Sequence, residues 1–400
     1  MQKDNKVCNI EPAARVHNVS EYYFSRKLKE IATMNKAGKQ VINLGIGSPD
    51  LPPSPRTINT LCQHARQADE HGYQPYTGIP ELRQAFADWY KRCYKVDINP
   101  DTEIQPLIGS KEGILHISLA FLNPCDGVLI PNPGYPTYSS VSHLAGARII
   151  PYELKTETGW YPDFEAIEQT DLSGVKLMWV NYPHMPTGAN ASMELFEKLV
   201  DFGRRHGIVI VNDNPYSFIL NDTPLSILRV PGAKDVCIEM NSLSKSHNMP
   251  GWRIAMLTSN ARFVQWILKV KSNIDSGQFK PMQYAAVAAM EAPQEWYEQM
   301  NDIYRSRRNS AGEIMNALHC RYDDNQTGLF LWGKIPEEAV SAESLTDRIL
   351  YEANVFITPG FIFGSQGERY IRISLCCKNE TLKEALNRIQ THINNICIWK

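Results

Sequence analysis

The sequence predicts an α/β protein with two domains: a large one with a central, mostly parallel seven-stranded sheet, and a smaller α/β one made from both chain ends. Short apolar runs rich in Val and Ile alternate with longer stretches of helical period, as expected of strand-helix-strand units around a parallel sheet. The 400 residues are enough for one large and one smaller domain, and the composition is that of a globular protein. We expect the large domain over residues 60–290 and the small domain over 1–59 and 291–400.

The strands of the large sheet are expected between residues 100 and 260. In chain order they are Pro106–Gly109, Gly127–Ile130, Arg148–Tyr152, Lys176–Asn181, Ile208–Asp213, Asp235–Met240 and Trp252–Leu257. Two helices have the clearest periodicity. Residues Pro80–Tyr94 place Leu82, Phe86 and Trp89 on one face, and Glu380–Ile396 carries a similar stripe of Leu and Ile. Both stripes are most simply explained by core packing.

Charge and cysteine content narrow the possible functions. The 41 Lys and Arg nearly balance the 43 Asp and Glu, so the net charge of −2 offers no attraction to nucleic acid. Nine scattered cysteines without a Cys-x-x-Cys pair fit reduced thiols better than disulfides or a zinc knuckle. Because no signal-peptide core or 18-residue apolar run occurs, we expect a cytoplasmic protein with no membrane partner. No His, Cys and carboxylate cluster has the spacing of metal ligands, so no metal is expected.

The segment from Ser242-Leu-Ser-Lys245 to Arg253 lies between two expected strands. A lysine flanked by small hydroxyl residues, with an arginine close behind, suits a lysine that bonds a carbonyl ligand beside an anion site. A solvated loop lysine is the alternative. The preceding strand ends in Asp213, followed by Tyr216, at the edge where open parallel sheets bind ligands. As an alternative, Asp213 is a helix cap or a turn residue.

Three further segments carry possible chemistry. Gly109-Ser110-Lys111 joins a strand to an apolar helix, so its backbone N–H groups could face a phosphate, or could form an ordinary cap. Tyr135 follows the next strand, where its ring could lie over a planar ligand or belong to a plain turn. Arg372 alternates with apolar residues on a strand, where its planar fork matches a carboxylate. A surface arginine is the other interpretation.

Taken in order, these segments resemble the class I/II aminotransferases of the type I pyridoxal-phosphate fold, from about Tyr22 to the end of the chain. Nine motifs in the same order along the chain identify this family far more specifically than any single motif does. They are Asn43-Leu-Gly-Ile-Gly47-Ser-Pro-Asp50, Tyr73-Gln-Pro-Tyr-Thr-Gly78, Gly109-Ser-Lys-Glu-Gly113, Pro133-Gly-Tyr135, Asn181-Tyr-Pro-His-Met-Pro-Thr-Gly188, Asp213-Asn-Pro-Tyr216, Ser242-Leu-Ser-Lys245 with Arg253, Pro359-Gly360 and Arg372. By the same resemblance, Tyr22-Tyr-Phe24 could cover the site.

The resemblance implies pyridoxal 5'-phosphate as the cofactor and three catalytic residues. Lys245 resembles the residue that holds the cofactor covalently and then carries the proton between Cα and the cofactor. Asp213 resembles the partner of the pyridinium nitrogen, which keeps the ring able to accept an electron pair. Tyr216 resembles the donor to the ring hydroxyl oxygen.

Other residues resemble binding groups of that family. The stacking ring corresponds to Tyr135, and the phosphate cup corresponds to Ser110, Lys111, Ser242 and Arg253. Tyr73 resembles a phosphate ligand supplied by the neighbouring subunit, which implies a homodimer with shared active sites. Asn181 and Arg372 resemble the pair that grips the substrate α-carboxylate. Gly47 would lie close above the substrate, where a side chain would intrude.

One position departs from the family pattern. The usual Asn of Asn-Pro-Thr-Gly, a donor to the ring hydroxyl oxygen, is replaced by Met185, which cannot donate. Either that oxygen keeps more negative charge, with Tyr216 as its donor, or Met185 simply packs against the ring and the substrate pocket. In the first case, His184 turning inward or a water could still replace the donor.

The resemblance implies an aminotransferase: an amino acid gives its nitrogen to the cofactor, and a 2-oxo acid takes it. A carbon-sulfur β-lyase on the same fold and a non-catalytic cofactor-binding protein are the alternatives, the latter motivated by Met185. A neutral or aromatic amino donor is favoured, since no arginine lies between Arg262 and Arg305, where dicarboxylate-specific relatives carry one. Lys269 and Lys271 keep another possibility open, because the segment after them resembles the diaminopimelate aminotransferase branch.

Overall fold

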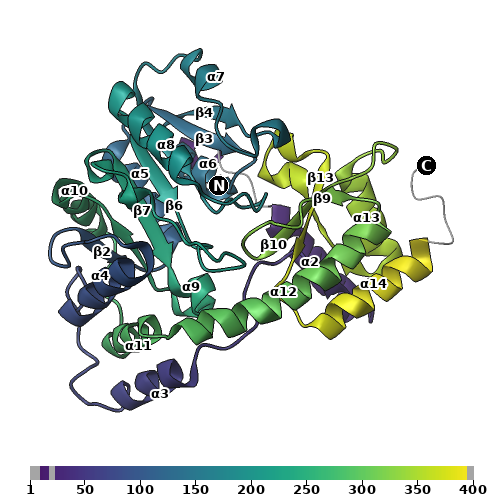
Figure 1. The fold of residues 1–400 in the computed structure, drawn as a ribbon, viewed down its shortest axis with the longest axis horizontal. Helices are drawn as coiled ribbons and strands as arrows, with labels where there is room; N and C mark the ends of the chain where they lie inside the picture. Colours follow the sequence, from purple (N-terminus) through teal and green to yellow (C-terminus); the bar gives the residue numbers. More distant parts are fainter. Residues whose placement is uncertain (1–9, 18–22, 394–400) are drawn as a thin grey trace, which may run out of the picture.

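The computed structural model describes residues 10–17 and 23–393. Its largest element is a seven-stranded sheet, which lies on one side of the molecule in Figure 1. Across the sheet the strands are β2 (Ile104–Leu107), β8 (Ala255–Thr258), β7 (Cys237–Ser242), β6 (Val209–Asp213), β5 (Val175–Val180), β3 (Gly127–Asn132) and β4 (Arg148–Glu153). Strand β8 runs opposite to the other six strands, so its pairs with β2 and β7 are antiparallel and the remaining pairs of this sheet are parallel. The predicted α/β class with a mostly parallel seven-stranded sheet is confirmed.

Helices cover both faces of this sheet, which is why its central strands are apolar on both sides. On β5, Leu177 and Trp179 join the core on one face, whereas Met178 and Val180 join the core on the other. The first core is completed by α5 (Ser110–Phe121), α6 (Pro136–Leu144) and α10 (Ala261–Lys271). The second is completed by α4 (Pro80–Tyr94), α7 (Phe164–Glu168) and α8 (Met193–His206). The two-residue period of the strand thus divides its side chains between two cores.

All seven predicted strands exist, but each differs from its predicted bounds at one or both ends. For the first and the last strand, a backbone turn explains the shift. The first ends at Leu107, because Gly109 takes a φ of +82° and α5 begins directly after it. The last begins at Ala255, because Pro250–Trp252 form a 3₁₀ turn and Arg253 is left-handed. Hydropathy alone does not reveal these backbone turns.

The two predicted helices are also present. The helix Pro80–Tyr94 is α4 and has the predicted bounds. The predicted C-terminal helix is α14 (Asn379–Ile393), which begins one residue earlier; the residues predicted to continue it, 394–396, lie outside the described residues.

The smaller part of the fold combines both chain ends. Its antiparallel sheet has the order β12 (Thr358–Pro359), β13 (Tyr370–Ser374), β10 (Phe330–Lys334) and β9 (Arg321–Tyr322). A parallel pair, β1 (Ile42–Asn43) with β11 (Val355–Phe356), joins the two ends of the chain. Helices α2 (Tyr23–Lys36), α13 (Ala342–Ala353) and α14 lie around these strands, and α12 (Gln294–Ala317) runs between the two parts (Figure 1). The domain boundaries near residues 60 and 290 stay a prediction.

The remaining described helices are short or peripheral. They are α1 (Ala14–His17), α3 (Pro55–His64), α9 (Leu243–Ser246) and α11 (Lys280–Met290), with 3₁₀ turns at Thr156–Thr158, Ile227–Arg229, Ala233–Asp235, Pro250–Trp252, Gly360–Phe363 and Ser365–Gly367. Within residues 10–17 and 23–393, no helix combines the length and the apolar character needed to cross a bilayer.

The sheet brings distant motifs to one edge. Asn181 directly follows β5, Asp213 ends β6, and Lys245 lies in the short helix after β7. The strands β5, β6 and β7 are parallel neighbours, so their carboxyl ends lie side by side. Open parallel sheets bind ligands at this edge.

Candidate active site

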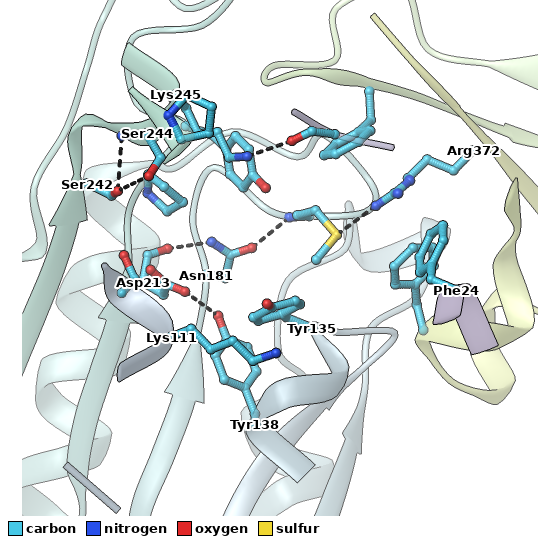
Figure 2. A pocket seen from close by; sticks show the side chains of 18 of the residues that line it. Phe24, Lys111, Tyr135, Tyr138, Asn181, Asp213, Ser242, Ser244, Lys245 and Arg372 are labelled. Carbon is cyan, nitrogen blue, oxygen red and sulfur yellow. Dashed lines mark hydrogen bonds between the residues drawn. The ribbon is translucent and has the colours of Figure 1, made fainter. Parts of the chain in front are cut away.

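A cavity of about 270 Å³ lies at this edge of the sheet (Figure 2). Every predicted site residue except Tyr73 lines it: Gly47, Ser110, Lys111, Tyr135, Asn181, Asp213, Tyr216, Ser242, Lys245, Arg253 and Arg372. Tyr73 is instead 95% exposed and does not line the cavity. The tertiary structure therefore gathers residues from more than three hundred positions of sequence into one small space.

Lys245 enters the cavity from α9. The helix is capped by Ser242, whose Oγ accepts a hydrogen bond from the backbone N–H of Ser244 at 3.1 Å. Lys245 Nζ donates to the carbonyl oxygen of Gly47 at 2.6 Å. Burial lowers the pKa of the Lys245 ammonium below its usual value, which favours the neutral, nucleophilic amine. Lys245 is thus a half-buried lysine of the cavity and not a solvated loop charge.

Asp213 lies deeper, at the end of β6. Its Oδ2 accepts a hydrogen bond from the hydroxyl of Tyr138 at 3.0 Å, whereas its buried Oδ1 has no hydrogen-bond partner among the described residues. Burial raises the pKa of Asp213 to about 6. A buried carboxylate with one free oxygen can accept a further N–H donor from a ligand.

Tyr138 is a site residue that the sequence analysis missed. It is fully buried, and its ring stacks on Trp179 with centroids 5.0 Å apart and planes 9° apart. It follows Tyr135 by three positions at the start of α6, and the two rings meet edge to face at 5.6 Å. Residues three apart on a helix share a face, so this spacing is the signal that could have found it.

The two tyrosines predicted around the cofactor ring both line the cavity. Burial raises the pKa of Tyr135 and of Tyr216 above the usual value for tyrosine, so both rings keep their hydroxyl protons near neutral pH. The ring of Tyr216 meets Phe330 edge to face at 6.1 Å.

The predicted phosphate cup lies at the amino end of α5. A Cβ built on Gly109, whose φ is +82°, would come within 2.1 Å of Nη2 of Arg253. Arg253 Nη1 donates to the carbonyl oxygen of Pro250 at 2.9 Å. Ser110 Oγ is buried without a hydrogen-bond partner in the described structure, and Lys111 is exposed at the cavity mouth. Donors, positive charge and a helix amino end therefore meet at one point, as an anion site requires.

Arg372 lies at the opposite end of the cavity and is only 4% exposed, so it is not a surface arginine. Its Nη2 donates to the carbonyl oxygen of Gly45 at 2.8 Å. Its guanidinium carbon lies 3.8, 4.6 and 5.7 Å from the ring centroids of Phe330, Phe363 and Phe24, respectively. Phe24 thus covers this end as expected. Tyr22 lies outside the described residues. The sequence did not predict Phe330 and Phe363 as lining residues.

Gly47 lines the cavity, but its nearest neighbour is protein. A Cβ at this position would lie 2.1 Å from Cζ of Phe330. A side chain at position 47 would therefore collide with Phe330. It would displace the ring that packs on Arg372.

Met185 contacts both Asn181 and Arg372. Its backbone N–H donates to Asn181 Oδ1 at 2.8 Å, and its Sδ accepts a hydrogen bond from Arg372 Nη1 at 3.2 Å. Asn181 Nδ2 also donates to the carbonyl oxygen of Asp213. His184 does not line the cavity: it is buried, pairs with Thr187, and burial lowers its pKa to about 3. The structure thus does not turn His184 inward.

Lys269 and Lys271, which left a diaminopimelate-type substrate possible in the sequence analysis, do not line the cavity. Lys269 is exposed, whereas Lys271 is buried and donates to Glu112 at 2.9 Å and to Asp275 at 2.5 Å. The ligand atoms of Glu112, His116 and Asp275 lie within 4.8 Å of one another, a cluster that sequence spacing did not predict. The ammonium of Lys271 therefore pairs with the two carboxylates of this cluster instead of facing the cavity.

Comparisons with known proteins agree with this geometry. The model of the family "Aminotransferase class I and II" matches residues 39–389. The chain is 40% identical over 377 residues to an LL-diaminopimelate aminotransferase from Dehalococcoides mccartyi, covering 94% of this chain and 97% of that protein. It is 41% identical over 383 residues to the corresponding protein of Aquifex aeolicus, covering 95% and 99%. The substrate-bound structure of BacF from Bacillus subtilis superposes with a TM-score of 0.90 at 35% identity, covering 96% and 98%. The chain therefore belongs to the class I and II aminotransferases, and it is a pyridoxal-phosphate-dependent transaminase of the type I fold.

Proposed function

We infer that this transaminase uses a diaminopimelate-type donor, an amino acid whose side chain ends in a second amino and carboxylate group. The observation that carries this inference is the 40% and 41% identity, along almost the whole chain, to LL-diaminopimelate aminotransferases. These relatives do not support the neutral or aromatic donor that the sequence favoured. That expectation rested on the lack of arginine in one segment, and other segments can supply polar contacts.

The resemblance of the segment after Lys271 to the diaminopimelate branch agrees with these relatives, but the two lysines before that segment do not reach the cavity. Lys271 is held by Glu112 and Asp275, and neither it nor Lys269 lines the cavity. The substrate proposal therefore depends on overall similarity and not on these two lysines.

The cavity residues fit pyridoxal phosphate. The free Oδ1 of Asp213 suits a protonated ring nitrogen, and the buried Ser110 Oγ suits a phosphate oxygen. Lys111, Ser242 and Arg253 would complete the phosphate contacts, Tyr135 would stack on the ring, and Tyr216 would donate to the ring hydroxyl oxygen. When bound, the cofactor supplies an electron sink for the pair released at the substrate Cα.

Within this arrangement Lys245 is the proton carrier. Burial lowers its pKa, which favours the neutral amine that can take a proton from Cα and return it elsewhere. The hydrogen bond to Gly47 holds Nζ inside the cavity until a ligand competes for it. Burial of the site around Lys245 and Asp213 keeps bulk water away from the reacting atoms.

Asn181 and Arg372 would bind the α-carboxylate. The guanidinium is charged at all working pH values and presents a planar fork, which suits two carboxylate oxygens. Packing against Phe330 and Phe363 restricts its rotation. A group held in this way loses little conformational entropy when the substrate binds.

The proposal includes a homodimer in the cytoplasm. Exposure of Tyr73 away from its own cavity supports a role in a neighbouring subunit's phosphate cup. The seven cysteines among the described residues are all free thiols, which supports a reducing compartment.

A donor screen tests this function. The loaded enzyme is mixed with 2-oxoglutarate and one donor at a time: LL-2,6-diaminopimelate, L-phenylalanine, L-leucine or cystathionine. We expect the highest kcat/KM for diaminopimelate, measured as glutamate formed, and no turnover with Lys245→Ala. A clear preference for phenylalanine or leucine would refute the donor class. Release of pyruvate, ammonia and thiol from cystathionine without glutamate would favour the β-lyase, and inactivity with every donor would favour the non-catalytic protein.

A further inference from the structure

Met185 connects the two residues expected to hold the substrate carboxylate. Its backbone N–H binds Asn181 Oδ1 at 2.8 Å, and its Sδ accepts from Nη1 of Arg372 at 3.2 Å (Figure 2). The side chain is 6% exposed and lines the cavity. The backbone contact is open to any residue with an N–H at this position, whereas the contact with Arg372 requires the thioether.

The two arms of the Arg372 guanidinium have acceptors of different strength. Nη2 donates to the carbonyl oxygen of Gly45 at 2.8 Å, whereas Nη1 donates to the thioether of Met185. A thioether is a weak acceptor, whereas a carboxylate forms a charge-assisted hydrogen bond with arginine. A carboxylate that enters the cavity can therefore replace sulfur at Nη1 with little loss.

We propose that Met185 is a positioning residue for carboxylate recognition: it orients Arg372 and Asn181 before the amino acid binds, and it releases Nη1 to the carboxylate. This inference rests on the proposed function, because it takes Arg372 as the carboxylate ligand. The methionine that replaces the family's Asn at position 185 would then act at the substrate end of the cavity, where its Sδ accepts from Arg372.

The proposal differs from both interpretations that the sequence allowed. A missing donor at the cofactor's ring oxygen would change the pH titration of the cofactor's visible absorption band. Packing alone would let leucine replace methionine without consequence, since the two side chains have similar volume. A positioning role instead predicts weaker binding of ligands that carry a carboxylate, and only of those.

The test compares two ligands that differ in the carboxylate. The one that carries it has no hydrogen on Cα, so it binds without being transaminated. 2-Aminoisobutyrate carries the carboxylate, and isopropylamine is its counterpart without one. Dissociation constants for both are measured by titration calorimetry on the cofactor-loaded protein. The variants are Met185→Leu, which removes the acceptor, and Met185→Gln, which offers a carbonyl oxygen instead. Met178→Leu, a buried methionine of β5 that does not line the cavity, is the matched control.

We expect Met185→Leu to weaken binding of 2-aminoisobutyrate roughly three- to tenfold, the range of one modest hydrogen bond, with isopropylamine unchanged. Met185→Gln should stay within about twofold of the wild type for both ligands, as should Met178→Leu. Equal binding of 2-aminoisobutyrate by Met185→Leu and wild type overturns the proposal, and so does an equal loss of both ligands. If the wild type transfers amino groups but binds the two ligands equally well, Arg372 is not the carboxylate ligand and the positioning role falls while the transaminase stands.

Discussion

Asp213 shows how burial of a single residue makes the site sensitive to pH. Its pKa is raised to about 6 by burial, whereas an unfolded chain gives about 3.9. Between these values the native state binds the extra proton, so this residue's contribution to stability is lost as the pH rises from about 4 to 6.

We therefore expect the cofactor-free Asp213→Asn variant to melt at the same temperature as the wild type near pH 4 and at a higher temperature above pH 6. Thermal denaturation of both proteins across this range measures the difference. Adding pyridoxal phosphate at neutral pH should stabilise the wild type more than the variant, because only the carboxylate can pair with a protonated ring nitrogen. A difference that does not vary with pH would show that folding leaves the pKa of Asp213 unchanged.

Lys271 and Lys269 form a natural pair for a second test. The side chain of Lys271 is 3% exposed and bonds two carboxylates, whereas Lys269, two positions earlier on the same helix, is exposed. Replacing Lys271 by Met leaves Glu112 and Asp275 with His116 as the remaining partner in this cluster, so we expect a loss of about 3 kcal/mol in unfolding free energy, the low end for breaking a buried ion pair. Lys269→Met should change it by no more than about 0.5 kcal/mol. Urea denaturation measures both, and similar small effects would show that the buried cluster does not stabilise the fold.

At the scale of elements, the start of α5 is the most constrained. Gly109 has a φ of +82° and lies directly against Arg253, whereas Gly38 has a similar φ of +85° and no atom within 4 Å of the point where a Cβ would lie. Alanine at either glycine introduces backbone strain, but only Gly109→Ala also displaces the guanidinium.

Both alanine variants should therefore lose stability, while only Gly109→Ala should lose cofactor affinity. We expect its dissociation constant for pyridoxal phosphate to rise roughly tenfold or more, the equivalent of one charged hydrogen bond. Fluorescence titration of the cofactor-free proteins gives the two constants. Unchanged affinity in Gly109→Ala would remove Arg253 from the phosphate cup.

At the scale of the whole molecule, the position of Tyr73 predicts shared active sites. If the partner's Tyr73 completes each phosphate cup, a hybrid dimer of one Lys245→Ala subunit and one Tyr73→Ala subunit contains one intact site. Co-expression of the two differently tagged subunits, purified through both tags, should then give more activity than either parent. A hybrid of Lys245→Ala with Asp213→Asn is the control, because each of its sites lacks one residue. Equal activity of the two hybrids would show that Tyr73 acts within its own subunit, and an unimpaired Tyr73→Ala parent would show that it does not act in catalysis.

The sequence by itself determined the α/β class, the seven strands and most of the cavity. Motif residues such as Asp213 and Lys245 follow strands, and parallel strands bring their carboxyl ends to one edge, so local pattern and topology suffice. The family resemblance then identified their partners.

Only the tertiary structure decided the contacts that depend on packing between distant segments. The Tyr138 hydroxyl on Asp213, the aromatic rings around Arg372, the burial of Lys271 and the thioether of Met185 on Arg372 all join elements far apart in the chain. Hydrophobic periodicity tells which face of an element is buried, but not which polar atom it meets there. Arginine spacing favoured a neutral or aromatic donor, which the similar proteins do not support, because spacing in the sequence does not show which side chains reach the cavity.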